Sequence, residues 1–97
     1  TALKLYEVVE NAIKRKKEEC ELVHGRQGIV GKRQKKEIGM HAIRAGSIVG
    51  EHSVLFAGLD EDICLRHRAQ SRDTFAKGAL KCAEFIYQKN PGFWQKK

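Results

Sequence analysis

The sequence predicts an α+β fold: a mixed, largely antiparallel sheet of about four strands with two helices on one face. Apolar residues recur at helical spacing near both ends of the 97-residue chain. Between them lie alternating stretches rich in branched and aromatic side chains and punctuated by glycines. This order of elements is typical of helices layered on a sheet. We expect a single domain over residues 1–97, because a chain of this length builds one modest core.

The first element is a helix. From Ala2 the apolar residues form one stripe at helical spacing, which predicts a helix over residues 2–17. Thr1 precedes it, and threonine is a residue type that caps helix N-termini. A short strand is expected next, at about residues 21–24.

A loop rich in glycine and charge follows, residues 24–37, with Gly25, Gly28 and Gly31 at intervals of three. A phosphate-binding loop would have to lie between a strand and a helix. Here the loop leads into another strand. We therefore favour a mobile connector or arm over a phosphate site.

Three longer strands are predicted after the loop, at residues 38–44, 52–57 and 62–69. The turn at residues 58–61 makes an antiparallel hairpin of the last two. Apolar side chains point to both faces of these strands, whereas two helices can cover only one face. The other face should therefore be buried in an oligomer or against another domain.

A second helix begins near Ser71, a good capping residue, with Asp73 placed where the helix dipole favours a negative charge. Asn90, Pro91 and Gly92 end it. Phe93 and Trp94 then lie in a short tail. Two aromatic side chains exposed on a tail are unusual in a monomer, so we expect them to pack on something.

The formal net charge is +7, and much of it lies in two Lys/Arg clusters, at residues 14–17 and 32–36. Such clusters can bind phosphate backbones, which keeps a small basic nucleic-acid-binding α+β domain as the alternative function. The aromatic residues lie in apolar patterns and are not interleaved with the clusters, so solvated surfaces are the favoured interpretation.

Three cysteines, Cys20, Cys64 and Cys82, are odd in number and form no CxxC pair. This pattern favours neither a disulfide framework nor a zinc site, and we expect no metal. No apolar stretch approaches the ~18 to 20 residues that cross a bilayer. We expect a soluble, cytoplasmic protein with reduced thiols and no membrane partner. The first residue is Thr1 and not Met, from which we expect a processed or excised chain.

Three stretches together resemble the C-terminal domain of the dihydrodipicolinate reductase family, and matching blocks cover nearly the whole chain. The middle stretch is the most specific, because strand patterning alone would rarely produce its Ile-Arg-Ala-Gly, Ile-Val-Gly-Glu-His and Phe-Ala-Gly series. The stretches are GRQGIVGKRQKKEIG (residues 25–39), HAIRAGSIVGEHSVLFAG (residues 41–58) and RHRAQSRDTFAKGALKCAEF (residues 66–85).

The resemblance implies an oxidoreductase of lysine and diaminopimelate biosynthesis that moves a hydride from NADH or NADPH to a cyclic unsaturated dicarboxylate. It implies a Rossmann-type nucleotide domain, a smaller substrate-binding domain, and assembly through the sheets into a homotetramer. The chain contains no GxGxxG turn. We therefore expect the cofactor to bind the intact enzyme and not this chain alone.

The family's substrate and catalytic signature is a pair of histidines and a lysine followed by Asp-Ala-Pro-Ser-Gly-Thr. Only the last threonine is present, as Thr1, so the resemblance implies that Thr1 binds a substrate carboxylate. The helix N-terminus behind it favours an anion. The catalytic histidine and lysine would lie upstream of Thr1. The chain has four histidines, His24, His41, His52 and His67, and none of them falls in the motif. We therefore expect no catalytic residue in this chain and no activity of the fragment alone.

The segment at residues 71–75 resembles the region where the family's chain returns from the substrate domain to the nucleotide domain. Arg72 and Phe75 are therefore expected to face the cofactor cleft. The alternative is that Arg72 is a surface charge and Phe75 an ordinary core residue. In the intact enzyme, the last helix and its tail would pack on the nucleotide domain.

Overall fold

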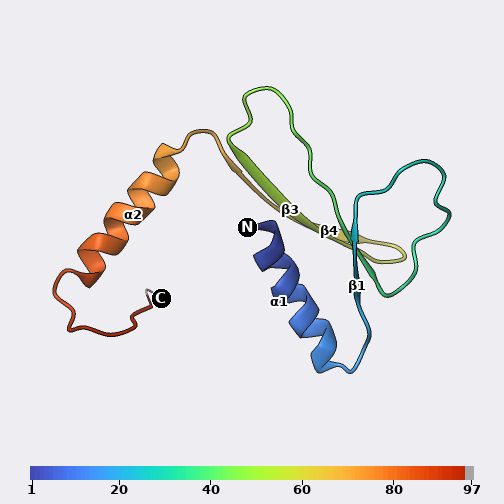
Figure 1. Ribbon diagram of the computed structural model, residues 1–97, viewed down its shortest axis with the longest axis horizontal. Coiled ribbons are helices and arrows are strands. Elements are labelled where there is room, and N and C mark those ends of the chain that lie inside the picture. Colours follow the sequence, from blue (N-terminus) through green and yellow to red (C-terminus); the bar gives the residue numbers. More distant parts are fainter. Residues whose placement is uncertain (96–97) are drawn as a thin grey trace.

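The structure is a computed structural model that describes residues 1–95 and confirms the α+β class. The expected helices and strands are all present, although several differ in length from the sequence prediction. In chain order they are α1 (Ala2–Arg15), β1 (Glu21–His24), β2 (Glu37–Met40), β3 (Gly50–Ala57), β4 (Asp62–Ala69) and α2 (Asp73–Ile86) (Figure 1).

Helix α1 is two residues shorter than expected. Its end is marked by Lys17, which has a φ of 59°, in the left-handed region that closes many helices. The amides of Lys16 and Lys17 donate to the carbonyls of Ile13 and Lys14 and so use acceptors of the last turn. Lys14 and Arg15 stand in that turn, where the helix dipole favours positive charge.

The strands form two sheets of two strands, and not the single sheet of about four strands that was expected. β1 pairs in parallel with β2, and β3 pairs antiparallel with β4. The strand expected at residues 38–44 ends at Met40. Residues 41–49 are irregular and contain Gly46 in the left-handed region, so this segment does not bring β2 to the edge of β3.

The β3–β4 hairpin has the expected antiparallel pairing, and β4 has the expected bounds. Its turn is closed by the Gly58 amide, which donates to the Glu61 carbonyl at 2.8 Å. Because side chains alternate, the register gives the hairpin one largely apolar face and one face on which charged side chains stand beside the apolar Leu55. Val54, Phe56, Ile63 and Leu65 share the apolar face, and Glu51, Arg66 and Arg68 share the other.

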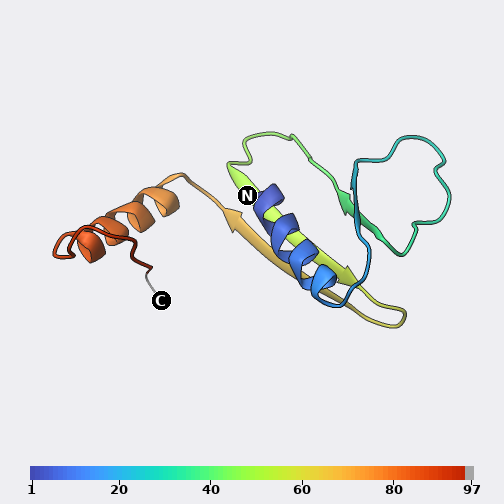
Figure 2. The same ribbon diagram turned by 60° about the horizontal axis from the view of Figure 1, so that its bottom comes forward.

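The two helices do not lie together on one sheet face, which differs from the sequence prediction. α1 runs alongside the β3–β4 hairpin, whereas α2 extends away from it (Figures 1 and 2). The apolar stripe of α2 is consequently open: Phe75 is 56% exposed and Leu80 is 67% exposed. α2 thus has the pattern of a packed helix without a packing partner in this chain.

The molecule is extended, with dimensions of 55 × 39 × 24 Å and a radius of gyration of 18.0 Å. A compact domain of this length has a radius of gyration of about 12.5 Å. Its accessible surface is 9495 Å², against about 5,600 Å² for a folded monomer of this mass. Ala69 is the one buried apolar residue among residues 1–95. The chain alone therefore forms almost no closed core.

Candidate functional site

Thr1 occupies the N-cap position of α1. Its carbonyl accepts the Leu5 amide at 3.0 Å, while its hydroxyl makes no capping hydrogen bond. The amides before Leu5 have no partner within the helix, because the first amides of any α-helix lack one. No acidic residue stands in this first turn. The hydroxyl, the free amides and the helix dipole together favour a carboxylate at this helix end.

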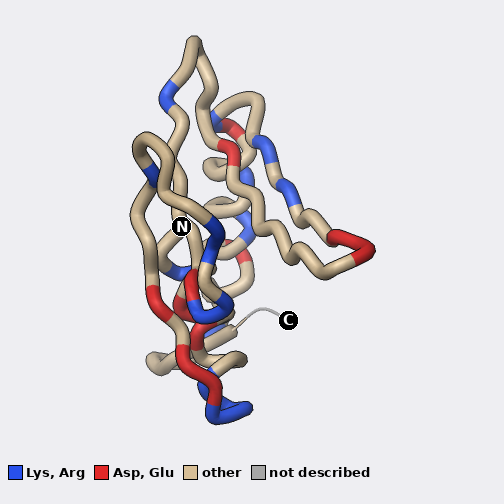
Figure 3. The backbone as a smooth tube through the Cα atoms, turned by 90° about the vertical axis from the view of Figure 1, so that its right-hand side faces the viewer, with Lys and Arg blue, Asp and Glu red and all other residues tan. Residues whose placement is uncertain are grey.

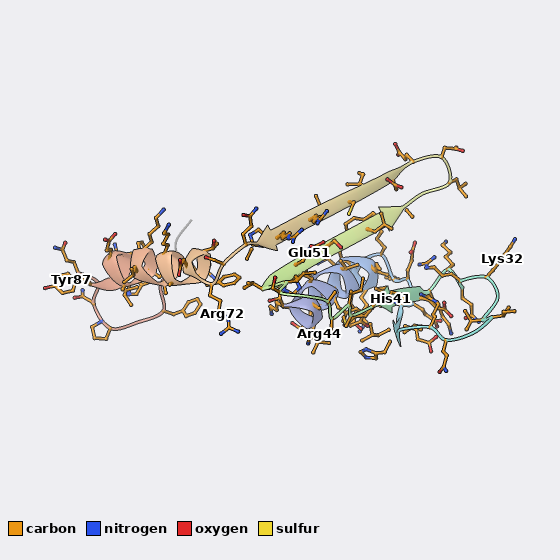
Figure 4. The ribbon with its side chains drawn as sticks, turned by 90° about the horizontal axis from the view of Figure 1, so that it is seen from above. Lys32, His41, Arg44, Glu51, Arg72 and Tyr87 are labelled. Carbon is orange, nitrogen blue, oxygen red and sulfur yellow. The ribbon has the colours of Figure 1, made fainter. Side chains whose placement is uncertain are left out.

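Arg72 and Phe75 lie at the junction between β4 and α2, where Figure 4 labels Arg72. The Asp73 amide donates to Ser71 Oγ at 3.1 Å, but the N-cap position is Arg72 and not Ser71 as expected, because the helix begins at Asp73. Within residues 1–95, Arg72 forms no salt bridge and its charge is not neutralised.

The Phe75 ring lies against the beginning of β3. A Cβ placed on Gly50 would be 4.0 Å from Phe75 Cζ, so glycine leaves the backbone open to the ring. The ring is nevertheless more than half exposed. Within residues 1–95, Phe75 therefore contacts the beginning of β3 without being buried in a core.

Thr1 and the β4–α2 junction lie at the same end of the hairpin (Figures 1 and 2). Two cavities within residues 1–95 lie elsewhere, one of about 380 Å³ at the C-terminal tail and one of about 170 Å³ at the glycine loop. Neither is lined by Thr1, Arg72 or Phe75. The candidate site is thus an open edge of the structure that belongs to neither of these two cavities.

The four histidines are not gathered in one cluster. His41 Nε2 lies 3.1 Å from Arg26 Nη1, and His24 ends β1. His52 and His67 face each other directly across the hairpin. Within the described part of the chain, no group of three or more His, Cys, Asp or Glu residues could hold a metal ion.

Sequence reasoning missed an ion cluster on the charged face of the hairpin. Glu51 Oε1 lies 2.9 Å from Arg66 Nε, and Glu51 Oε2 lies 3.9 Å from Arg68 Nε. Figure 4 labels Glu51 on β3. The alternation of Arg66 and Arg68 in the sequence indicates that both side chains share one strand face. The ion pairs with Glu51 could be identified only from the strand register, which pairs Glu51 with Arg68.

A second missed cluster joins the two ends of the glycine loop. Arg26 Nη2 lies 3.3 Å from Glu37 Oε2, and Arg33 Nη2 donates to the Glu37 carbonyl. A Cβ on Gly39 would be 2.8 Å from Arg26 Nη1, so a larger residue there would displace the end of the arginine side chain. These contacts therefore tie the beginning of the glycine loop to its end.

A third cluster centres on Glu10 of α1. Its Oε1 accepts from Tyr6 Oη at 3.0 Å and pairs with Lys14 Nζ at 2.9 Å. Partial burial, together with the hydrogen bond to Glu10, raises the pKa of Tyr6 to about 12. Hydrogen bonds from Lys14 and Tyr6 lower the pKa of Glu10, and the bond to Glu10 raises the pKa of Lys14. This cluster stabilises α1 and does not belong to the open edge.

The charges do not form one basic surface. Figure 3 shows Lys/Arg segments separated along the tube, with Asp/Glu segments between them. Lys14, Arg26 and Lys36 each pair with a glutamate. The nucleic-acid alternative is therefore not favoured. Within residues 1–95, neither helix has the length and apolar composition to span a bilayer.

Comparison with known proteins agrees with the resemblance of the three stretches. The family described as "Dihydrodipicolinate reductase, C-terminus" matches residues 1–97. Proteins named 4-hydroxy-tetrahydrodipicolinate reductase from Hahella chejuensis, Syntrophus aciditrophicus and Staphylococcus epidermidis are 53%, 47% and 49% identical over 94 residues, 97% of this chain. The chain spans only 35%, 35% and 38% of their respective lengths. The chain therefore belongs to the dihydrodipicolinate reductase family and corresponds to the C-terminal part of its proteins.

Proposed function

We propose that this chain is the substrate-binding and assembly domain of an NAD(P)H-dependent reductase of lysine and diaminopimelate biosynthesis. The substrate is a cyclic dicarboxylate of the dihydrodipicolinate type. The observation that carries this function is the open edge, where the N-terminus of α1 at Thr1 lies at the same end of the hairpin as Arg72 and Phe75.

At this edge Thr1 binds one substrate carboxylate. The hydroxyl and the first-turn amides of α1 donate to its oxygens, and the helix dipole favours its charge. Holding the carboxylate fixes the ring relative to the edge, and such positioning is a large part of catalysis in reactions between two bound molecules. The catalytic histidine and lysine belong to the part of the polypeptide that this chain does not include.

Arg72 and Phe75 suit the border of a nucleotide site. An arginine without a carboxylate partner can pair with a phosphate, and a half-exposed ring offers a flat apolar contact. NADH or NADPH would supply the hydride for the substrate ring. Within residues 1–95 no glycine-rich turn joins a strand to a helix, since the glycine loop connects β1 with β2. The main nucleotide contacts therefore belong to another domain.

Helix α2 and the tail after it pack on that nucleotide domain. Their exposed apolar side chains, among them Leu80, Ile86 and Phe93, support this arrangement. The unpaired edges and exposed faces of the two sheets, together with the 9495 Å² surface, support a homotetramer that is assembled through the sheets. Three unpaired cysteines are consistent with a cytoplasmic location.

A turnover assay on the full-length protein tests this function. We expect consumption of reduced nicotinamide that depends on the dihydrodipicolinate-type substrate and is inhibited competitively by a pyridine dicarboxylate. The isolated 97-residue chain should bind NADH negligibly. Absence of turnover with both NADH and NADPH, or tight NADH binding by the isolated chain, would rule the assignment out.

A further inference from the structure

Two exposed segments of the chain carry opposite charges. Within residues 1–95, several of these charged side chains form no ion pair. We call residues 25–36 the basic loop and residues 58–62 the acidic tip. The basic loop contains five Lys/Arg residues and no acid, and the acidic tip contains Asp60, Glu61 and Asp62 and no Lys or Arg. Figure 3 shows the acidic tip as a red segment at the turn of the hairpin.

Within residues 1–95 the charges of the acidic tip are unpaired, because none of its three carboxylates lies within 4.0 Å of a Lys or Arg nitrogen. In the basic loop, Arg26 and Lys36 pair with glutamates. Lys32 and Lys35 have no such partner. Figure 4 shows Lys32 at the outer end of the loop. Each segment therefore presents at least two uncompensated charges of one sign.

Each segment also presents an apolar side chain beside those charges. Ile29 in the basic loop and Leu59 in the acidic tip are fully exposed, the most exposed of the large apolar side chains in the described chain. An aliphatic contact surrounded by ion pairs is the usual composition of a small protein–protein contact, with an apolar centre and a charged rim. Nucleic acid would leave Ile29 without a partner.

The two segments project from the same end of the molecule but diverge from each other (Figures 1 and 2). A contact between them within one copy is therefore not made. Two copies related by a twofold axis can make it twice, since the loop of each copy then meets the tip of the other. This arrangement neutralises both sets of charges and covers both exposed aliphatic side chains.

We propose that the basic loop binds the acidic tip of a second copy of this chain, with Lys32 and Lys35 pairing with the carboxylates of Asp60, Glu61 and Asp62 and with Ile29 packing on Leu59. The contact rests on the proposed assembly role of the domain and specifies which segments of two copies meet. The charges of this contact determine which surfaces of the two copies associate. They raise the association rate more than they raise the affinity.

Charge reversal in the full-length protein tests the contact by sedimentation velocity at about 50 mM and about 500 mM salt. One variant reverses the loop (Lys32→Glu with Lys35→Glu) and one reverses the tip (Asp60→Lys with Glu61→Lys). Each alone should raise the dissociation constant at low salt by about 10-fold or more, and less at high salt. Where dissociation is too weak to measure, the subunit-exchange rate is the readout.

Mixing the two reversed variants in equal amounts is the decisive step. In the mixed pair both contacts become attractive again, so association should return to within about threefold of wild type. Lys77→Glu with Lys81→Glu on α2 is the matched control and should behave as wild type. Leu59→Ser, a change in an exposed turn, should weaken association at both salt concentrations.

Failure of the mixture to recover, when one protein carrying all four changes does recover, would place the contact within a single copy and overturn the proposal. Unchanged association of both reversed variants would also overturn it. Turnover is measured on the same samples. Normal turnover without a charge effect refutes only this contact, and an intact charge effect without turnover refutes only the proposed function.

Discussion

At the scale of single residues, Thr1 lies where the sequence predicts it, at the N-terminus of a helix. Threonine predicted a helix cap, and the structure has it at the N-cap with a hydroxyl that does not cap the helix. A hydroxyl released from capping is available to a ligand. Its proposed carboxylate contact is a hydrogen bond to a charged group, worth about 1.5 to 3 kcal/mol in typical cases.

We predict that Thr1→Val in the full-length protein raises the KM for the dicarboxylate substrate by about 10-fold to 100-fold, because valine keeps the shape and removes the donor. Thr1→Ser is the control and should retain most of the affinity. Steady-state kinetics with saturating reduced nicotinamide give the comparison. An unchanged KM in Thr1→Val would exclude the hydroxyl from substrate binding.

The Tyr6–Glu10–Lys14 cluster predicts a pH dependence at the alkaline end. The folded-state pKa of Tyr6, about 12, lies above its ordinary value of 10.0. The stability that this group contributes is therefore fully present below pH 10 and is lost as the pH rises toward 12. The raised pKa of Lys14 acts in the same direction.

A difference titration of phenolate absorbance between wild type and Tyr6→Phe isolates this group. The difference should titrate near pH 12. Glu10→Gln should move it toward 10.0 without restoring that value fully, because partial burial remains. A difference curve centred at 10.0 in the wild type would contradict the cluster geometry.

Local residue chemistry was predictable only where it depends on sequence neighbours. Ser71 was singled out because a hydroxyl acts on amides a few residues away, and it accepts from the Asp73 amide although Arg72 holds the N-cap position. The Glu51–Arg66–Arg68 and Arg26–Glu37–His41 clusters were missed, since their members are distant in sequence and meet only through strand register or loop closure.

At the scale of elements, periodicity located both helices and the hairpin, and β4 matched to the residue. Strand pairing was less predictable. β2 ends four residues earlier than predicted, and the four strands form two sheets instead of one. The apolar pattern does not state which strand edges pair, so this division could not be predicted from it. The stripe of α2 predicted burial, whereas Phe75 and Leu80 are more than half exposed within residues 1–95.

We predict that α2 is protected only in the full-length protein. Backbone amides of Asp73–Ile86 should exchange with deuterium at least about 100-fold more slowly there than in the isolated chain, because docking buries the stripe that contains Phe75 and Leu80. Peptides from the basic loop, residues 25–36, report the effect of assembly separately. Equal exchange of α2 in both samples would show that the helix docks on nothing.

At the scale of the whole molecule, the main physical feature is a large accessible surface on an extended shape. The accessible surface of 9495 Å² exceeds that of a compact monomer by several interfaces of about 800 Å² per partner. The sequence indicated this from apolar side chains on both faces of the strands and from the aromatic tail. Under the proposed function, part of this surface receives the nucleotide domain and part of it receives other copies.

Light scattering coupled to size-exclusion chromatography of the full-length protein at micromolar concentration tests that result most directly. We predict a mass of four subunits, because the sheets and the basic loop leave surface that a single subunit cannot cover. A monomeric mass throughout the micromolar range would contradict the assembly role and the interpretation of the open surface.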